Sequence, residues 1–201
     1  MTLTPRLQKA IDTAALLHKD HVRIGKNKIP YITHLIHVLA ILDNHEANED
    51  TLIAGLLHDT LEDIPEYTGE KLALDFGDNV RNIVESLTEI RIFDDKLSPR
   101  ERWIAAKRSY LEKLSAASRE AHMISAADKI HNMSCIIEGY ETEDEIMMLR
   151  FDTLALMGQV WFNGEVLKVL SGNIPSNLEE EYSKYLSKLQ LLQEKYPDKR
   201  Y

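Results

Sequence analysis

The stretch Ala54-Gly55-Leu56-Leu57-His58-Asp59-Thr60-Leu61-Glu62-Asp63 places an imidazole and three carboxylates within six residues, directly behind an apolar run. Read as one helix at about 100° per residue, its apolar side chains gather on one face. The opposite face then carries the four ionisable side chains, namely His58, Asp59, Glu62 and Asp63. The stretch therefore predicts a helix that is anchored by its apolar face and presents a compact polar patch.

This patch has two interpretations. Three neighbouring carboxylates repel one another unless a cation or bound protons compensate their charge, which favours a metal site. The alternative is a solvated polar face near the end of a helix, because acids there oppose the helix dipole by only about 0.3–1 kcal/mol each. The choice between them depends on whether other segments of the chain supply further metal-ligand side chains to the patch.

The composition is typical of one soluble domain with a sizeable core, since 44% of the 201 residues are hydrophobic and 28% are charged. A formal net charge of -9 without an extended basic run argues against nucleic acid as the main partner. A local cluster of Lys and Arg can still bind phosphates, so a small-molecule nucleotide remains open as a substrate.

The single cysteine, Cys135, excludes an internal disulfide and fits a reducing compartment. The sequence has no charged-then-apolar leader and no apolar run long enough to span a bilayer. We therefore expect a cytoplasmic protein without a membrane partner. The sequence does not determine an oligomeric state.

Helix signals follow one another along nearly the whole chain. Thr4-Pro5 is typical of an N-cap followed by proline at the first helical position. Further helices are expected near Thr33, from Asn48, from Thr68 to about Leu87 with an interruption at Gly77, from a capping box at Ser98–Glu101, and from Arg119 to Glu138. Capping boxes at Thr142 with Glu145 and at Ser176 with Glu179 predict the last helices, over about 142–195. No alternating strand pattern or internal repeat is present, so the sequence predicts an all-α single domain.

A carboxylate also lies inside one of the most apolar stretches of the chain. Asp128 follows Met123-Ile124-Ser125-Ala126-Ala127 and precedes Lys129-Ile130. Burying a carboxylate is costly without a cation or strong hydrogen bonds. Asn132 lies one helical turn further on and shares its face. A metal ligand, a carboxylate bonded to a neighbouring helix and a carboxylate facing water all remain open for Asp128.

Two histidines lie one helical turn apart in the segment that precedes the His58-Asp59 pair. His34 and His37 could ligate a metal as a pair, although a lone histidine on such a helix is more often a core or surface residue. With His58, Asp59 and Asp128, His34 supplies a set of two imidazoles and two carboxylates, and His37 is the rival to His34. Mixed nitrogen and oxygen ligands suit Mn²⁺ or Fe²⁺, with open positions for water, better than a closed structural zinc site.

These residues resemble a known family. His34, the adjacent pair His58-Asp59 and Asp128 look like the metal ligands of the HD-domain phosphohydrolase superfamily. Within it, His58-Asp59-x-x-Glu62-Asp63 resembles the extended motif of RelA/SpoT-type alarmone hydrolases. Other segments match in order over roughly residues 10–140: His18 with Arg23, Gly25 and Pro30-Tyr31-Ile32-x-His34; then Val84-x-x-Leu87-Thr88; then Ala127-Asp128-Lys129-x-His131-Asn132-Met133. The resemblance implies an HD-domain bundle of about eight or more helices, with residues 1–201 as one stand-alone hydrolase domain.

The resemblance also implies an activity. Enzymes of this family use one Mn²⁺ to remove pyrophosphate from the 3′ position of (p)ppGpp, which leaves GDP or GTP. A metal lowers the pKa of its bound water and offsets charge on phosphoryl oxygens. A carboxylate beside that water can take its proton. Glu62 and Asp63 match that pair, so we expect Asp63 to orient or deprotonate water and Glu62 to assist proton transfer, with the split between them open.

Three further residues match family positions that bind substrate. Arg23 matches an arginine that contacts substrate, Lys107 resembles a lysine that reaches the phosphates, and Asn132 matches an asparagine near the nucleotide. The alternative for Arg23 and Lys107 is ordinary solvated surface charge.

At three positions where the family often has an arginine or a lysine, this chain has the uncharged residues Ile24, Ala106 and Ser134. These departures weaken (p)ppGpp as the substrate more than they weaken metal-dependent phosphohydrolysis. Two alternatives stay open: an HD-type phosphohydrolase acting on another nucleotide or a phosphorylated nucleotide cofactor, and a non-catalytic nucleotide-binding helical module. The Glu62-Asp63 pair argues against the module, which gains nothing obvious from two extra acids.

Overall fold

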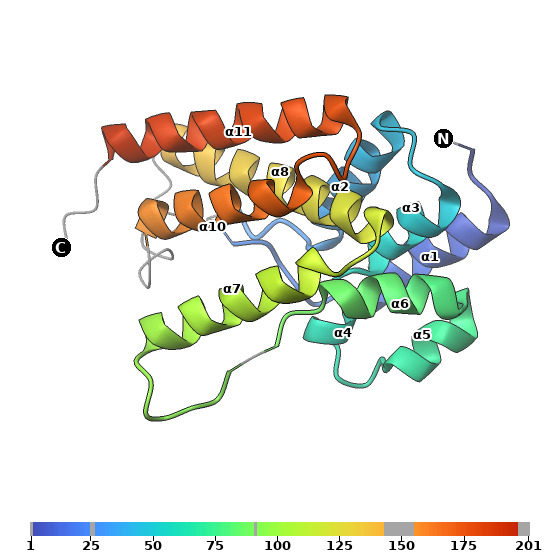
Figure 1. Cartoon of the computed structure of the whole chain (residues 1–201). Helices are drawn as coiled ribbons and strands as arrows, with labels where there is room; N and C mark the ends of the chain where they lie inside the picture. Colours follow the sequence, from blue (N-terminus) through green and yellow to red (C-terminus); the bar gives the residue numbers. More distant parts are fainter. Residues whose placement is uncertain (1, 25–26, 91, 143–154, 197–201) are drawn as a thin grey trace.

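The computed structural model describes residues 2–24, 27–90, 92–142 and 155–196. Within these ranges the chain is built from helices, and the one β-type pairing is an isolated antiparallel bridge between Val22 and Pro30. The prediction of an all-α protein is thus confirmed. The helices labelled in Figure 1 are α1 (Pro5–Leu17), α2 (Ile32–Asn44), α3 (Glu49–Leu57), α4 (Thr60–Asp63), α5 (Gly69–Phe76), α6 (Asp78–Leu87), α7 (Pro99–Ser115), α8 (Arg119–Glu141), α10 (Ala155–Leu170) and α11 (Ser176–Lys195).

Helix α8 forms the axis of the bundle (Figure 1) and contacts α2, α3, α6, α10 and α11. Its buried side chains come from all sides of the helix and include Ile124, Ile130 and Met133, which are nearly inaccessible to solvent. A helix that is apolar all round belongs in the interior. Asp128 therefore enters the core with the middle of α8 and is 7% exposed.

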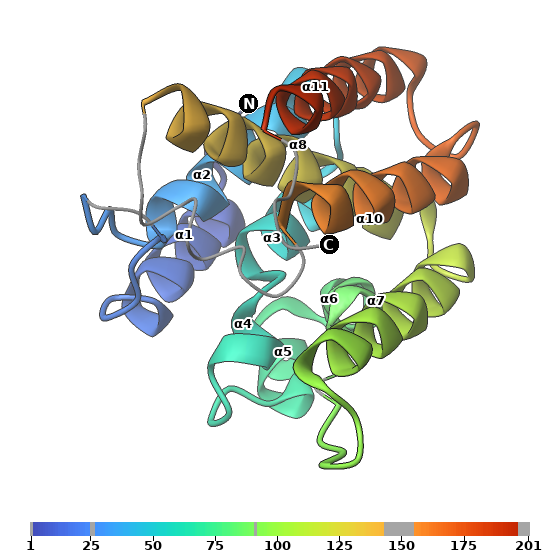
Figure 2. The same ribbon diagram turned by 90° about the vertical axis from the view of Figure 1, so that its left-hand side faces the viewer.

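Helix α3 is the second buried element. Seven of its nine residues are buried, and it contacts α1, α2, α6 and α8. Figure 2, turned by 90°, shows α3 between α1 and α2 on one side and α6 on the other. Because α2, the C-terminal end of α3 and the middle of α8 pack together, the predicted ligands on these elements are brought to one place.

The stretch Ala54–Asp63 is not one continuous helix, which corrects the prediction. Helix α3 ends at Leu57, and His58 and Asp59 form a turn before the short α4. The Thr60 hydroxyl donates to the Leu57 carbonyl at 2.6 Å, and His58 Nδ1 donates to the Gly55 carbonyl at 2.8 Å. Side chains thus satisfy carbonyls that a continuous helix would bond through backbone amides.

Most predicted helix ends are confirmed. Thr4, Asn48 and Thr68 cap their helices with side-chain oxygens, and the Ser98–Glu101 capping box has both of its hydrogen bonds. Gly77 separates α5 from α6 with φ of 92°, a conformation that favours glycine.

The capping box expected at Ser176 is wrong. Helix α11 begins there without a side-chain cap, and Glu179 instead accepts hydrogen bonds from Ser171 Oγ and the Gly172 amide. The capping box expected at Thr142 with Glu145 lies outside the described residues. No helix in the described part of the chain combines the length and apolarity needed to cross a membrane.

Candidate metal centre and adjoining cleft

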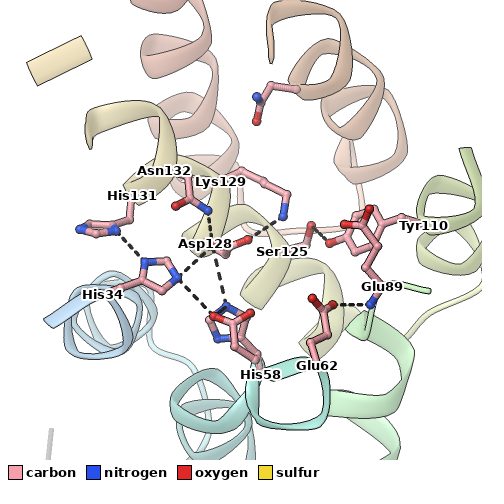
Figure 3. A network of polar contacts seen from close by, with 12 residues as sticks. His34, His58, Glu62, Glu89, Tyr110, Ser125, Asp128, Lys129, His131 and Asn132 are labelled. Carbon is pink, nitrogen blue, oxygen red and sulfur yellow. Dashed lines mark hydrogen bonds and ion pairs between the residues drawn. The ribbon is translucent and has the colours of Figure 1, made fainter. Parts of the chain in front are cut away.

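The four predicted ligands meet in the interior. His34 lies in the first turn of α2, His58 and Asp59 in the turn after α3, and Asp128 in the middle of α8. His34 Nε2 lies 3.2 Å from Asp128 Oδ1 and 3.7 Å from Asp59 Oδ2. His58 Nε2 lies 3.1 Å from Asp59 Oδ2 and 3.8 Å from Asp128 Oδ1. Figure 3 shows His34, His58 and Asp128 pointing toward one another. We call these four side chains the metal cluster.

Of the two rival histidines, His34 reaches the cluster and His37 does not. The His34 ring is held through Nδ1, which lies 2.7 Å from His131 Nδ1, so that Nε2 faces the carboxylates (Figure 3). His37 is exposed, its Nδ1 donates to the Thr33 carbonyl at 2.7 Å, and its ring stacks on His131. The geometry excludes His37 from this cluster.

His58 and Asp59 are oriented by hydrogen bonds outside the cluster. His58 Nδ1 bonds the Gly55 carbonyl, which leaves Nε2 facing the carboxylates. The Tyr31 hydroxyl donates to Asp59 Oδ2 at 2.6 Å. Burial and the Asp59 carboxylate both raise the pKa of Tyr31, so this hydroxyl stays a donor. Such outer contacts fix the rotamer of a ligand, as in metal sites generally.

Asp128 and Lys129 form a buried ion pair at the edge of the cluster. Lys129 Nζ lies 2.6 Å from Asp128 Oδ2, and Asn132 Nδ2 donates to Asp128 Oδ1 (Figure 3). Burial alone would raise the pKa of Asp128, but Lys129 and the two cluster histidines hold it well below its usual value. Burial alone would lower the pKa of Lys129, but Asp128 holds it well above its usual value. Asp128 is therefore ionised and available as a ligand.

The cluster attracts positive charge. Burial by itself would lower the pKa of His58, but Asp59 and Asp128 raise it to about 9. The pKa of the neighbouring His34 is lowered, because burial outweighs the same carboxylates. Without a metal, two carboxylates thus hold a proton on one imidazole. A bound divalent cation would take the place of that proton.

The donors fit a divalent ion. His58 Nε2 is buried and makes no hydrogen bond within the described ranges, although Asp59 lies close to it. His34, His58 and Asp59 each offer a ligand atom, and these atoms lie within 4.8 Å of one another. A cation would give this nitrogen a partner and offset two carboxylate charges. Two nitrogen and two oxygen donors suit a transition metal of the Mn²⁺ or Fe²⁺ type.

Glu62 lines the same hollow as the metal cluster. A cavity of about 140 Å³ is bounded by Glu62, His58, Asp59, Asp128, Lys129 and Asn132, among others. The Glu62 carboxylate accepts a hydrogen bond from the Glu89 amide (Figure 3). Burial raises the pKa of Glu62 to about 7; the Glu89 amide lowers it in part, and the Asp59 charge adds to the rise. A carboxyl that titrates near neutrality suits general acid–base chemistry.

Asp63 is placed differently from Glu62. Its carboxylate lies beside His18 and His21, with a ligand atom of each residue within 4.8 Å of the others. The break in the helix at His58 and Asp59 turns Glu62 toward the cluster and leaves Asp63 on this neighbouring side. The predicted pair is therefore adjacent in sequence but divided between two polar clusters.

The three predicted substrate residues line one cleft. This cleft has a volume of about 230 Å³, is bounded by Arg23, Lys107 and Asn132, and shares Lys129 and Asn132 with the cavity at the metal cluster. Arg23 Nη2 donates to Asn132 Oδ1 at 2.8 Å, and Lys107 Nζ lies 2.7 Å from Glu89 Oε2. The cleft thus brings cations next to the acidic cluster.

The structure gives roles to several residues for which the sequence predicted none. Lys129 joins the two hollows and lies over the rings of Tyr110 and Phe162. Tyr31 and His131 hold metal-cluster residues through hydrogen bonds. The sequence indicated Lys129, Tyr31 and His131 only by their position, because all three lie in the segments that resemble the family. Helix α10 adds aromatic and amide side chains to the cleft, namely Gln159, Phe162 and Asn163.

Comparisons with known proteins identify the fold. Residues 10–153 match the HD domain family. The chain belongs to the HD-domain family. It is 37% identical over 141 residues to the guanosine-3′,5′-bis(diphosphate) 3′-pyrophosphohydrolase MESH1 of Xenopus tropicalis and 35% identical over 141 residues to that of Homo sapiens. Each alignment covers 67% of this chain and 74% of the relative.

A solved structure supports the relationship over nearly the full length. It is that of a metazoan ortholog of SpoT that hydrolyzes ppGpp, and it covers 94% of this chain and 97% of its own, with a TM-score of 0.71 and 25% identity. The resemblance to the HD-domain and RelA/SpoT-type hydrolases is confirmed. This HD-domain protein is a phosphohydrolase whose fold implies a divalent metal, with the His and Asp side chains of the metal cluster as the candidate ligands.

Proposed function

We propose that this HD-domain protein hydrolyses the 3′-pyrophosphate of (p)ppGpp to GDP or GTP and pyrophosphate, with Mn²⁺ as its metal. One observation carries the proposal: the cavity at the metal cluster shares Lys129 and Asn132 with a cleft that is lined by the cations Arg23 and Lys107. The relatives at 35–37% identity are hydrolases of this substrate, which supports the same reaction here. A binding module would need neither the cluster nor the half-buried Glu62 beside it.

His34, His58, Asp59 and Asp128 would hold the ion. When bound, it would supply a Lewis acid for the phosphoryl oxygens and make the attacking water more acidic. Oxygen and imidazole ligands with room for water favour Mn²⁺ over a structural zinc ion. Tyr31 and His131 keep Asp59 and His34 in place for this task.

Glu62 is the carboxylate best placed to hold or accept a proton of the attacking water. It lines the metal cavity, and its pKa of about 7 lets it take up and release a proton near neutrality. The family pattern favours Asp63 for orienting water and Glu62 for assisting. The geometry favours the opposite division, with Asp63 assisting from the side of His18 and His21.

The cleft would bind the nucleotide and its phosphates. Arg23 and Lys107 supply cations on its walls, and Lys129 supplies one at the junction with the metal cavity. Asn132 links the two regions, because it bonds both Arg23 and Asp128. Lys129 offers a cation near the cluster in a chain that lacks the family's frequent cations at Ile24, Ala106 and Ser134.

The test is product identification. The Mn²⁺-loaded protein is incubated with ppGpp, pppGpp and a panel of other phosphorylated nucleotides, and products are separated by anion-exchange chromatography. We expect GDP or GTP with pyrophosphate in equal amounts. Intact ppGpp after prolonged incubation would refute the proposed substrate, and orthophosphate from a monoester in the panel would move the activity to another nucleotide. A cytoplasmic setting remains a prediction from the single cysteine.

A further inference from the structure

A second group of metal-type donors lies beside the metal cluster, formed by His18, His21 and Asp63. His18 is the residue after α1, His21 lies in the following loop and Asp63 ends α4. One ligand atom from each lies within 4.8 Å of the other two, the same closeness as for His34, His58 and Asp59. We propose that His18, His21 and Asp63 form a second divalent-cation site, suited to Zn²⁺.

The two imidazoles are spaced like ligands of one ion. His18 Nδ1 and His21 Nδ1 lie 3.2 Å apart. Two nitrogens bound to a tetrahedral zinc at 2.0–2.1 Å are separated by about 3.3 Å. With the Asp63 carboxylate, the three side chains offer two imidazole nitrogens and one carboxylate oxygen. Two histidines and one carboxylate, with a fourth position for water, are a frequent zinc ligand set.

The site is held in shape by the backbone around it. The His21 amide donates to the His18 carbonyl at 3.0 Å, and the His21 carbonyl accepts from the Tyr31 amide at 2.9 Å. The His18 ring stacks on the Tyr31 ring with centroids 5.1 Å apart. Ligands fixed before the ion arrives lose little freedom on binding, which favours a real site over a chance grouping.

This site is next to the metal cluster but uses other ligands. Tyr31 separates the two, since its ring stacks on His18 while its hydroxyl donates to Asp59. An ion on Asp63 would withdraw that carboxylate from proton transfer, a consequence that rests on the proposed function. The existence of the site does not rest on it, because metal content is measured without any assay of hydrolysis.

The experiment counts zinc in the full-length protein. The protein is stripped with a chelator, loaded with excess Zn²⁺, desalted and analysed by plasma mass spectrometry. We expect two zinc ions per chain for the wild type, one for His21→Gln, one for His58→Ala and none for the double variant. His37→Gln is the matched control, because His37 is exposed and lies outside both groups, and it should retain two.

Asp63→Asn keeps the shape of the side chain and should also reduce the content to one ion, so the result does not depend on a single variant. Circular dichroism checks that each variant keeps its helices. Zinc content equal to that of the wild type in both His21→Gln and Asp63→Asn would overturn the second site. Either result is independent of whether ppGpp is hydrolysed.

Discussion

Two adjoining hollows with opposite properties make up the site. The first is lined by one imidazole and four carboxylates, namely His58, Asp59, Glu62, Glu89 and Asp128, and the metal-cluster side chains are between 1% and 19% exposed. The second is lined by Arg23, Lys107 and aromatic side chains. Lys129 and Asn132 belong to both. A hollow rich in carboxylates and a hollow with basic and aromatic walls are thus joined through one short stretch of α8.

This division has a physical reason. A cation at the metal cluster needs desolvated anionic ligands, whereas phosphates need positive charge that can adapt to them. Lys129 lies between the two regions, because it pairs with Asp128 on one side and lines the cleft on the other. If the division is real, changes in the first hollow should abolish the chemistry, and changes in the second should weaken substrate binding.

The largest effect is expected for His58→Ala. Removing a ligand should empty the metal cluster of Mn²⁺ and lower kcat/KM by at least about 10³-fold, because the metal supplies several kcal/mol of transition-state stabilisation. Steady-state kinetics and Mn²⁺ content measure both effects. The matched control is His37→Ala, which removes an exposed histidine outside the cluster. Equal losses in the two variants would contradict the assignment of His58.

Glu62→Gln should keep the metal and lose turnover. The amide oxygen can still accept the Glu89 amide, but it cannot take a proton, so kcat should fall by about 10²–10⁴-fold with little change in KM. The same assay on Asp63→Asn ranks the two acids. A smaller loss for Asp63→Asn supports Glu62 as the main group, and unchanged kcat in Glu62→Gln would remove Glu62 from the mechanism.

Metal affinity should depend on pH through His58. Its pKa of about 9 means that a proton occupies the imidazole at neutral pH in the metal-free protein. Because the ion needs the neutral ring, the affinity should rise with pH, by up to about tenfold per unit, until the pH passes about 9. Isothermal titration with Mn²⁺ between pH 6.5 and pH 8 (before the metal hydrolyses) measures the slope. A flat profile would show that His58 does not exchange a proton for the metal.

The smallest effect is expected in the cleft. Arg23→Ala should raise KM for ppGpp by about tenfold and leave the Mn²⁺ content unchanged, since one charge-assisted contact contributes roughly 1.5–3 kcal/mol when well formed and less when half-exposed. Lys184→Ala, which removes an exposed cation on α11, is the control. A loss of metal in Arg23→Ala would mean that the two hollows are not separate in function.

The metal cluster was predictable because its residues carry local signals. A carboxylate in an apolar helix, a His-Asp pair behind an apolar run and a histidine at a helix start each stand out from their surroundings. The all-α architecture and most helix ends were predictable for the same reason, since caps and periodicity are properties of a few neighbouring residues.

The remaining features depend on contacts that are distant in sequence. The helix break at His58 and Asp59 is set by side chains bonding carbonyls within α3, which helical periodicity does not report. Asp63 meets His18 and His21 only because the loop after α1 packs against α4. Glu179 bonds Ser171 and Gly172, so a capping-box pattern at Ser176 was misleading. The part of α10 that lines the cleft had no motif at all.

The most direct test of the account is an anomalous difference map from a crystal of the protein grown with Mn²⁺. We expect the strongest peak within about 2.0–2.3 Å of His34 Nε2, His58 Nε2 and carboxylate oxygens of Asp59 and Asp128. A strongest peak elsewhere, with His34 or Asp128 unliganded, would contradict it.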